Sequence, residues 1–248
     1  MTVPSTQARV ALVTGGSGGI GRAVVERLAR EGYHLGVHYS ANKATADEIV
    51  ESITAAGGHA IAVGGDVADE VAMAAAFDSV EEAFGGIDVL VHTAGIMRLQ
   101  PIADLDLSEL DAVHRTNIRG TFVVDQLAAR RLRAGGAIVN FSTSVVGLQF
   151  PGYGAYVASK GAVEALTLVL ARELRGRDVT VNAVAPGPTA TPLFLDGKDE
   201  AAIEKLAAQP PLERLGRPED IAHLTAFLVG PDGRWVNGQN IRDNGGII

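Results

Sequence analysis

Tyr156 and Lys160 stand four residues apart in "YGAYVASKGAVEAL", a stretch with the pattern of a helix running to about Arg175. This spacing places both side chains on one face of the helix. A free tyrosine has a pKa of about 10, too high for ready proton exchange at neutral pH, and a neighbouring ammonium lowers it. The pair therefore indicates a general acid or base, although exposed pairs with this spacing also occur in helices without activity.

Three hydroxyl residues, Ser142, Thr143 and Ser144, follow an apolar run in "IVNFSTSVVG". A hydroxyl at the end of a strand could donate a hydrogen bond to a substrate carbonyl beside the tyrosine. Strand ends are also rich in hydroxyls simply because these residues cap turns.

The glycine-rich stretch "TGGSGGIG", residues 14–21, predicts a phosphate-binding turn. It can be read as G-x-G-x-x-G beginning at Gly16, or as T-G-x-x-x-G-x-G with Gly15 as its first glycine. The expected strand ends at Thr14, which favours the second reading. Backbone N–H groups and the positive end of the following helix would then face a pyrophosphate.

The segment after the second expected strand reads "GVHYSANKATADE" and would contact the adenosine ribose. NAD-type sites carry an acidic residue there, about 20 residues after the glycines, to bind the 2′-hydroxyl. Here the first acid is Asp47, which belongs to the next helix. Ser40, Asn42 and Lys43 suit a 2′-phosphate, so we expect NADPH rather than NADH; Lys43 has the alternative of being a solvated lysine at a helix start.

Short apolar runs alternate with longer stretches of helical spacing along the whole chain. Runs that are apolar at nearly every position suit parallel strands covered on both faces, and the alternation predicts an α/β fold. The expected strands are 9–14, 34–39, 59–66, 87–95, 136–142, 178–186 and, more weakly, 236–243. We therefore predict one doubly wound domain over residues 1–248. The least regular stretch, 187–216, follows the sixth strand and is expected to be a substrate lid, or else a helical surface excursion.

Composition restricts the class of protein and its partners. The 248 residues have a net charge of -8, which argues against nucleic acid or an anionic membrane as the main partner. There is no cysteine, so there is no thiolate nucleophile or thiolate metal site, and no metal is expected. No uncharged run approaches about 18 residues and the start has no apolar signal core, so we expect a cytoplasmic protein.

Six motifs occur in the order and spacing of the short-chain dehydrogenase/reductase family, which the whole chain resembles. They are "TGGSGGIG", "AG" at 94–95, "TNIRG" at 116–120, "STSVVG" at 142–147, "YVASK" at 156–160 and "VNAVAPGPTAT" at 181–191. The resemblance implies a single Rossmann domain with a seven-stranded parallel sheet and helices on both faces. It is nearest to the 3-oxoacyl-[acyl-carrier-protein] reductase branch, with features of polyketide-type hydroxynaphthalene reductases.

The resemblance also implies roles for individual residues. Tyr156 would protonate the carbonyl, and Lys160 would lower the pKa of Tyr156 and bind the nicotinamide ribose. Ser144, rather than the two hydroxyls before it, would polarise the carbonyl. Asn117 would hold a water in a proton relay, although a kink in the helical pattern 105–133 would also explain this polar residue.

Cofactor contacts implied by the motifs, together with the ribose segment above, are Gly15, Ser17, Gly18, Gly19, Ile20, Gly21, Ser40, Asn42, Lys43, Asp66, Val67, Ala94, Gly95, Tyr156, Lys160, Pro186, Gly187, Thr189 and Thr191. Expected substrate-pocket residues are Met97, Val146, Gln149, Tyr153, Leu193 and Phe194.

The sequence departs from the family pattern in two places. The usual Asn-Asn-Ala-Gly is "HTAG" here, with His92 and Thr93 in the asparagine positions. Members that prefer NADPH often carry Arg or Lys where this chain has Gly18, which leaves the choice of cofactor to residues 40–43.

The expected function is NADPH-dependent reduction of a ketone or other carbonyl. The alternatives are an NAD-dependent sugar or secondary-alcohol dehydrogenase and, from another class, a non-catalytic dinucleotide-sensing protein. The resemblance further implies a homotetramer built through the long helices and the C-terminal segment "VNGQNIRDNGGII".

Overall fold

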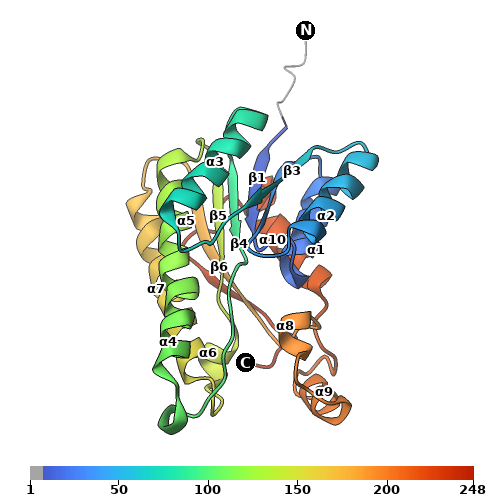
Figure 1. The fold of residues 1–248 in the computed structure, drawn as a ribbon, viewed down its shortest axis with the longest axis vertical. Helices are drawn as coiled ribbons and strands as arrows, with labels where there is room; N and C mark the ends of the chain where they lie inside the picture. Colours follow the sequence, from blue (N-terminus) through green and yellow to red (C-terminus); the bar gives the residue numbers. More distant parts are fainter. Residues whose placement is uncertain (1–7) are drawn as a thin grey trace.

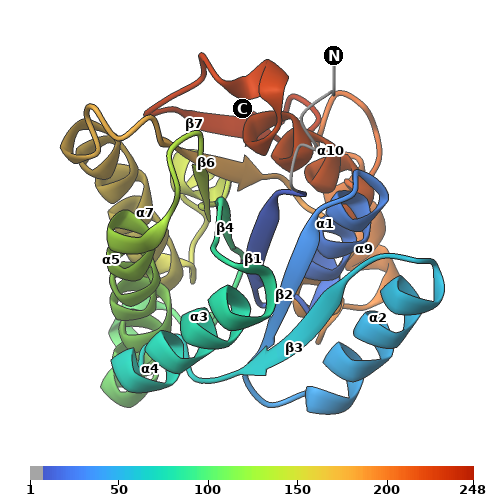
Figure 2. The ribbon, with the colours of Figure 1, turned by 90° about the horizontal axis from the view of Figure 1, so that it is seen from above.

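Seven parallel strands form the centre of the structure, a computed structural model that describes residues 8–248 (Figures 1 and 2). Residues 1–7 of the expected domain lie outside the described part. The strands are β1 (Val10–Thr14), β2 (His34–Tyr39), β3 (Ala60–Gly64), β4 (Val89–His92), β5 (Ala137–Phe141), β6 (Thr180–Pro186) and β7 (Asn240–Asp243). All seven coincide with the expected apolar runs, so the doubly wound α/β fold is confirmed.

The strand order is β3-β2-β1-β4-β5-β6-β7, so the chain reverses direction across the sheet between β1 and β4. Thr14 at the end of β1 lies opposite His92 at the end of β4. In open parallel sheets, ligands bind beyond the carboxyl ends of the strands at such a reversal point. The fold therefore places the glycine turn after Thr14 at the expected binding edge.

Helices cover both faces of the sheet: α1, α2 and α10 lie on one face, and α3, α5 and α7 on the other (Figure 2). The helices are α1 (Gly19–Arg30), α2 (Lys43–Ala55), α3 (Glu70–Phe84), α4 (Leu107–His114), α5 (Gly120–Arg131), α6 (Val145–Leu148), α7 (Gly154–Glu173), α8 (Pro192–Leu195), α9 (Glu200–Ala207) and α10 (Pro218–Val229). Short 3-10 turns occur at η1 (Ile102–Asp104) and η3 (Pro231–Gly233).

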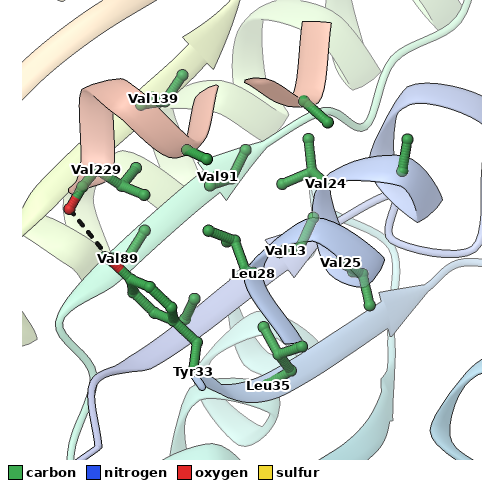
Figure 3. Close-up of a cluster of buried hydrophobic side chains, with 14 of the residues drawn as sticks. Val13, Val24, Val25, Leu28, Tyr33, Leu35, Val89, Val91, Val139 and Val229 are labelled. Atoms are coloured by element: carbon green, nitrogen blue, oxygen red, sulfur yellow. Dashed lines mark hydrogen bonds between the residues drawn. The ribbon is translucent and has the colours of Figure 1, made fainter. Parts of the chain in front are cut away.

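The hydrophobic core has two layers because successive residues of a strand point to opposite faces. In β1, Ala11 and Val13 belong to the layer beneath α1 and α10, whereas Val10 and Leu12 belong to the layer beneath α3, α5 and α7. Figure 3 shows the first layer packed around Leu28 of α1. This two-sided burial explains why the strands lack the alternating polar residues of an exposed sheet.

Helix α7 has 20 residues and a mean hydropathy of 1.2, enough to cross a membrane by length and composition alone. In this fold it lies against β6 and α4, and its apolar residues Val163 and Leu170 are buried there. Packing on the sheet accounts for these buried residues, whereas Leu168 and Val169 of the same helix are exposed.

Two segments differ in detail from the simplest expectation. The helical pattern 105–133 is divided into α4 and α5 by a π-helical turn, η2 (Arg115–Arg119), which contains the buried Asn117. The irregular stretch 187–216 carries α8 and α9, which lie beyond the carboxyl ends of the strands, near α6 (Figure 1). Both segments border the site described next.

Candidate active site

The glycine-rich turn has no room for side chains at four of its five glycines. Gly15 has φ of 66°, and a Cβ there would lie 2.9 Å from the backbone nitrogen of Ala94. At Gly21 a Cβ would lie 2.2 Å from the carbonyl oxygen of Gly15, and at Gly19 it would lie 2.8 Å from Thr191. Gly18 is different, because its nearest neighbour would be 3.5 Å away. A Cβ on Gly16 would also lie 2.9 Å from the Val13 carbonyl oxygen. All three glycines of the reading 15, 19 and 21 are crowded, whereas the alternative reading 16, 18 and 21 includes the open Gly18.

A groove runs along this turn and across the ends of β1, β2 and β4. Its lining includes Gly15, Ser17, Gly18, Gly19, Ile20, Gly21, His38, Ser40, Asn42, Asp66, Val67, Thr93, Ala94, Gly95, Thr116 and Thr191. The exposed start of α1 and the missing Cβ atoms leave backbone N–H groups accessible to a pyrophosphate. The residues present thus fit a dinucleotide.

Asp66 is the only carboxylate among the described residues that line this groove, and it is paired with Arg115. Burial opposes ionisation of Asp66, but hydrogen bonds from the Ala68 N–H and from Arg115 lower its pKa on balance. The carboxylate is therefore ionised and oriented at the expected adenine end of the groove.

Lys43 does not line the groove. It lies in the first turn of α2, where its Nζ is 2.6 Å from Asp47, and its side chain is 65% exposed. Asn42 caps the same helix by accepting a hydrogen bond from the Thr45 N–H at 3.4 Å, and it faces the groove with Ser40. Its i,i+4 ion pair directs Lys43 along the helix, so its expected contact with the cofactor stays a prediction.

Tyr156 and Lys160 of α7 line a second cavity, which shares Ile20, Gly95 and Thr191 with the groove. Lys160 is buried and its Nζ donates a hydrogen bond to the Phe141 carbonyl at 2.7 Å. Burial lowers the pKa of Lys160 to about 8. Burial raises the pKa of Tyr156 to about 12, and a hydrogen bond with the Thr143 hydroxyl acts in the opposite direction. Because this pKa is far above neutral, proton transfer from Tyr156 during a reaction needs an additional group that stabilises the phenolate.

The three consecutive hydroxyls point to three different partners. Ser142 donates to Glu164 at 2.6 Å, and Ser144 donates to the Ala185 carbonyl at 3.0 Å. A hydrogen bond between Thr143 and Tyr156 lowers the pKa of the phenol. Ser144 also accepts a hydrogen bond from Asn244 at 3.0 Å and is 2% exposed. All three hydroxyl residues line the cavity that contains Tyr156, so the expected contact of Ser144 with the substrate carbonyl stays a prediction, with Thr143 as the alternative donor.

Asn117 is fully hydrogen-bonded through its carboxamide. Its Oδ1 accepts from the Ile96 N–H at 2.9 Å, while its Nδ2 donates to the Ile96 carbonyl at 2.9 Å and to Ser159 at 3.0 Å. A Cβ on Gly95 would lie 3.2 Å from this Oδ1 and 3.4 Å from Lys160 Nζ. The π-turn thus brings Asn117 next to Lys160 at the junction of groove and cavity, and its role in a water relay stays a prediction.

Comparison with known proteins agrees with this geometry. A family model described as "Enoyl-(Acyl carrier protein) reductase" matches residues 15–247. A short-chain type dehydrogenase/reductase of Picea abies is 43% identical over 97% of this chain and 92% of its own length. The crystal structure of a short chain dehydrogenase from Burkholderia cenocepacia in complex with NADP superposes with a TM-score of 0.91 and 41% identity, covering 97% of this chain and 98% of that one.

The chain belongs to the short-chain dehydrogenase/reductase family. It is an NAD(P)-dependent oxidoreductase, as the implied family membership predicted. Two further relatives narrow the comparison. The NADPH-dependent aldehyde reductase-like protein, chloroplastic, of Arabidopsis thaliana is 40% identical over 97% of this chain and 94% of its own length. The 3-oxoacyl-[acyl-carrier-protein] reductase FabG of Staphylococcus aureus is 40% identical over 96% and 97%.

His92 replaces the first asparagine of the family motif and connects β4 to the π-turn. Its Nδ1 lies 2.7 Å from the Thr14 hydroxyl and its Nε2 lies 3.1 Å from the Thr121 hydroxyl. Thr121 already donates its proton to the Asn117 carbonyl at 2.7 Å, so it must accept from His92 Nε2–H. Burial lowers the pKa of His92 to about 3, which keeps the ring neutral in this short-chain dehydrogenase. Thr93 instead donates to the Thr14 carbonyl at 2.6 Å.

The nicotinamide end of the family site is formed by the residues after β6. Thr189 donates to the Gly187 carbonyl at 2.9 Å, and Thr191 caps α8 by accepting from the Phe194 N–H at 3.2 Å. Pro186, Gly187, Thr189 and Thr191 all line the cavity that holds Tyr156.

The substrate cavity is mostly apolar. Of the predicted pocket residues, Met97, Tyr153, Leu193 and Phe194 line it, whereas Val146 and Gln149 do not. In the single turn of α6, Val145 and Leu148 face the cavity, so the neighbouring positions point elsewhere. Lining residues that the sequence analysis missed are Val145, Leu148, Phe150, Pro188, Leu206, Gln209 and Ile247. They come from separate short elements with no motif in common, so no sequence pattern singled them out.

Proposed function

We propose that this chain is an NADPH-dependent carbonyl reductase that converts an aldehyde or ketone to the corresponding alcohol. The observation that carries the proposal is that Tyr156, Lys160 and the Thr143 hydroxyl line one cavity whose surface is mostly apolar. This cavity is continuous with the glycine-rich groove through Ile20, Gly95 and Thr191. A carbonyl held by the two hydroxyls would therefore lie at the junction of the substrate and cofactor sites.

Each residue has a defined part in the proposed reaction. NADPH, when bound in the groove, supplies the hydride. The Thr143 hydroxyl holds the carbonyl oxygen and polarises the C=O bond, and Tyr156 O–H gives its proton to that oxygen as negative charge develops on it. Lys160, fixed by the Phe141 carbonyl, keeps a positive charge near the tyrosinate that is left. Asn117 would hold a water in the relay that returns a proton to the Tyr156 oxygen. Alcohol oxidation would use the same groups in reverse.

The preference for NADPH is supported by the groove and by the relatives. Ser40 and Asn42 face the groove as uncharged polar groups, and the one carboxylate that lines its described part is already paired with Arg115. The Arabidopsis relative is named as NADPH-dependent, and the Burkholderia structure contains NADP.

Replacing Ser40 with Asp should reduce kcat/KM with NADPH at least tenfold relative to NADH, because a carboxylate repels the 2′-phosphate. Lys43→Ala should leave the ratio of kcat/KM with NADPH to kcat/KM with NADH unchanged. A large change in this ratio would show that Lys43 contacts the cofactor.

The substrate class is best supported as an uncharged apolar carbonyl compound. The cavity wall is largely aliphatic and aromatic, and its polar groups are Tyr153, Gln209 and the hydroxyl and amine groups around Tyr156 and after β6. The predominance of apolar groups disfavours the sugar dehydrogenase alternative, because several sugar hydroxyls would face apolar side chains. The 40% sequence identity to the Staphylococcus aureus FabG supports 3-oxoacyl thioesters as further candidate substrates. The segment 187–216, which contributes Leu193, Phe194 and Leu206, would close over the bound substrate.

The test is a substrate panel monitored by NADPH consumption. Apolar aldehydes, ketones, 3-oxoacyl thioesters and, in the oxidative direction with NAD, sugars and secondary alcohols should be compared at equal concentration. The proposal expects the first three groups to include the best substrate. Turnover only with sugars and NAD would contradict it, and no turnover with cofactor still bound would favour the non-catalytic sensing alternative.

We also propose that the chain forms a homotetramer through its long helices and C-terminal segment. Phe122 of α5, with Leu168 and Val169 of α7, are exposed apolar residues on these helices, and Trp235 before β7 is 99% exposed. Sedimentation velocity should give a species of four chains. A monomer at micromolar concentration would contradict this proposal.

A further inference from the structure

Residues 244–248 lie between the catalytic hydroxyl loop and the lid segment, far in sequence from both. Asn244 donates from Nδ2 to Ser144 Oγ at 3.0 Å, which attaches the segment to the end of β5. A Cβ on Gly187 would lie 2.7 Å from Asn244 Cα, so the same residue also packs against the turn after β6. The start of the segment is thus held against two loops of the active site.

The middle of the segment packs against the base of the lid. Gly245 and Gly246 have φ of 66° and 88°, and their turn is closed by the Gly246 N–H, which donates to Asn244 Oδ1 at 2.9 Å. Side chains at these glycines would lie 3.1 Å from Pro210 and 3.3 Å from Pro211. The left-handed backbone and this close approach both require glycine. The turn therefore fixes the direction of the residues that follow.

The two isoleucines at the end of the segment face different surroundings. Ile247 lines the substrate cavity, together with Leu148 and Leu206 from opposite sides of it. Ile248 instead lies over Gly147 of α6, where an added Cβ would be 2.5 Å from its Cδ1, and it does not line the cavity. Ile248 therefore packs the end of the segment against α6, whereas Ile247 contacts the space where the substrate would bind.

We propose that Ile247 is a specificity-determining residue that limits the size of the carbonyl substrate. It reaches the cavity on a segment anchored to Ser144, to Pro210 and Pro211 of the lid base, and to Gly147. Because the segment is held on several sides, a change in the volume of residue 247 changes the cavity rather than being absorbed by movement. The reaction that this wall restricts is the one given under Proposed function, on which this inference rests.

The test compares Ile247→Ala, Ile247→Phe and the matched control Ile248→Ala over straight-chain aldehydes from butanal to decanal. A methylene group in a hydrophobic pocket discriminates by roughly 10- to 200-fold. Ile247→Ala should therefore shift the optimum of kcat/KM to longer chains, with at least a tenfold change in the decanal-to-butanal ratio, and Ile247→Phe should shift it to shorter ones. Ile248→Ala should leave the ratio within about twofold. A parallel change for all chain lengths, or the same shift in Ile248→Ala, would overturn the proposal.

A binding measurement separates this inference from the proposed function. N-alkylformamides carry a carbonyl and an alkyl chain, and titration calorimetry of their binding in the presence of NADP needs no turnover. Ile247→Phe should weaken binding of the long-chain members at least tenfold and leave N-methylformamide unchanged. Suppose that these amides bind with the expected dependence on chain length and on residue 247, but that the wild type reduces no aldehyde. The proposed function would then be wrong, whereas the inference that Ile247 limits the size of the ligand would be supported. If chain length has no effect on the Ile247 variants in either assay, the inference is wrong.

Discussion

Thr143 is the side chain on which the proposed chemistry depends most directly after Tyr156. Among three adjacent hydroxyls it is the one whose hydrogen bond lowers the pKa of the phenol, whereas Ser142 donates to Glu164 and Ser144 to the Ala185 carbonyl. A donor aimed at a developing oxyanion acts mainly in the transition state, so its loss lowers kcat more than it raises KM.

We expect Thr143→Val to reduce kcat for carbonyl reduction by about 10²- to 10³-fold, the usual effect of removing one oxyanion donor. Thr143→Ser keeps a hydroxyl and should retain most of the activity. Ser144→Ala removes only a structural bond and should have a smaller effect than Thr143→Val. Steady-state kinetics on one good substrate decides the matter, and a larger loss in Ser144→Ala would reverse the assignment.

Asp125 of α5 is a buried acid outside the proposed chemistry. Burial raises its pKa to about 7, against the effect of a 2.9 Å hydrogen bond from Asn140 Nδ2. Among the described residues, Asp125 Oδ1 and Asn140 Oδ1 are both buried acceptors without a donor. A proton on Asp125 supplies that donor and makes a paired acid and amide.

The stability of the protein should therefore depend on Asp125 between about pH 4 and 7. An unfolded aspartic acid has a pKa near 3.9, so in this range the folded state holds one more proton than the unfolded state. The free energy of unfolding should then fall as pH rises, by at most about 1.4 kcal/mol per pH unit from this group. Asp125→Asn keeps the paired geometry without titrating, so denaturation at a series of pH values should show a flatter profile. Identical profiles for variant and wild type would contradict this account.

At the scale of elements, the β1–α1 turn tests the reading of the glycines. Gly21→Ala would normally stabilise a helix by about 1 kcal/mol, but its Cβ would lie 2.2 Å from the Gly15 carbonyl oxygen. We expect this variant to lose NADPH affinity at least tenfold, measured by the fluorescence of bound NADPH. Gly18→Ala is the matched control, because Gly18 has φ of -98° and open space around it, and its affinity should change less than threefold. Equal losses of NADPH affinity in both variants would contradict the reading of the turn with glycines at 15, 19 and 21.

The elements themselves could be predicted because each strand is apolar at nearly every position, as buried parallel strands must be. The break between α4 and α5 was less accessible, because apolar spacing continues through 105–133 and only the buried Asn117 marks the π-turn. The glycine turn and the Tyr156–Lys160 pair are local in sequence, so spacing was enough to find them.

The remaining features depend on contacts between distant segments. The partners of Ser142 and Ser144 are Glu164, Ala185 and Asn244, none of which is near in sequence. Ile247 enters the cavity from a segment about 100 residues beyond Ser144, through bonds that no periodic pattern records. The position of Lys43 outside the groove could not be predicted either, because it depends on the ion pair with Asp47.

At the scale of the whole molecule, the sheet brings three parts together at one edge. The glycine turn follows β1, the hydroxyls follow β5, and α7 carries Tyr156 and Lys160 against β6. Residues 187–216, the expected lid, and residues 244–248 contribute further lining to the same cavity. Most of the expected cofactor contacts lie in the groove and not on Tyr156, so we expect the loss of the Tyr156 hydroxyl to leave most of the cofactor binding intact.

The Tyr156→Phe variant, assayed with NADPH and the best carbonyl substrate of the panel, tests the central claim most directly. Loss of the general acid should lower kcat by about 10²- to 10⁴-fold, while the NADPH dissociation constant stays within a few-fold of the wild-type value. Retention of wild-type carbonyl reduction by this variant would contradict the mechanism proposed for this enzyme.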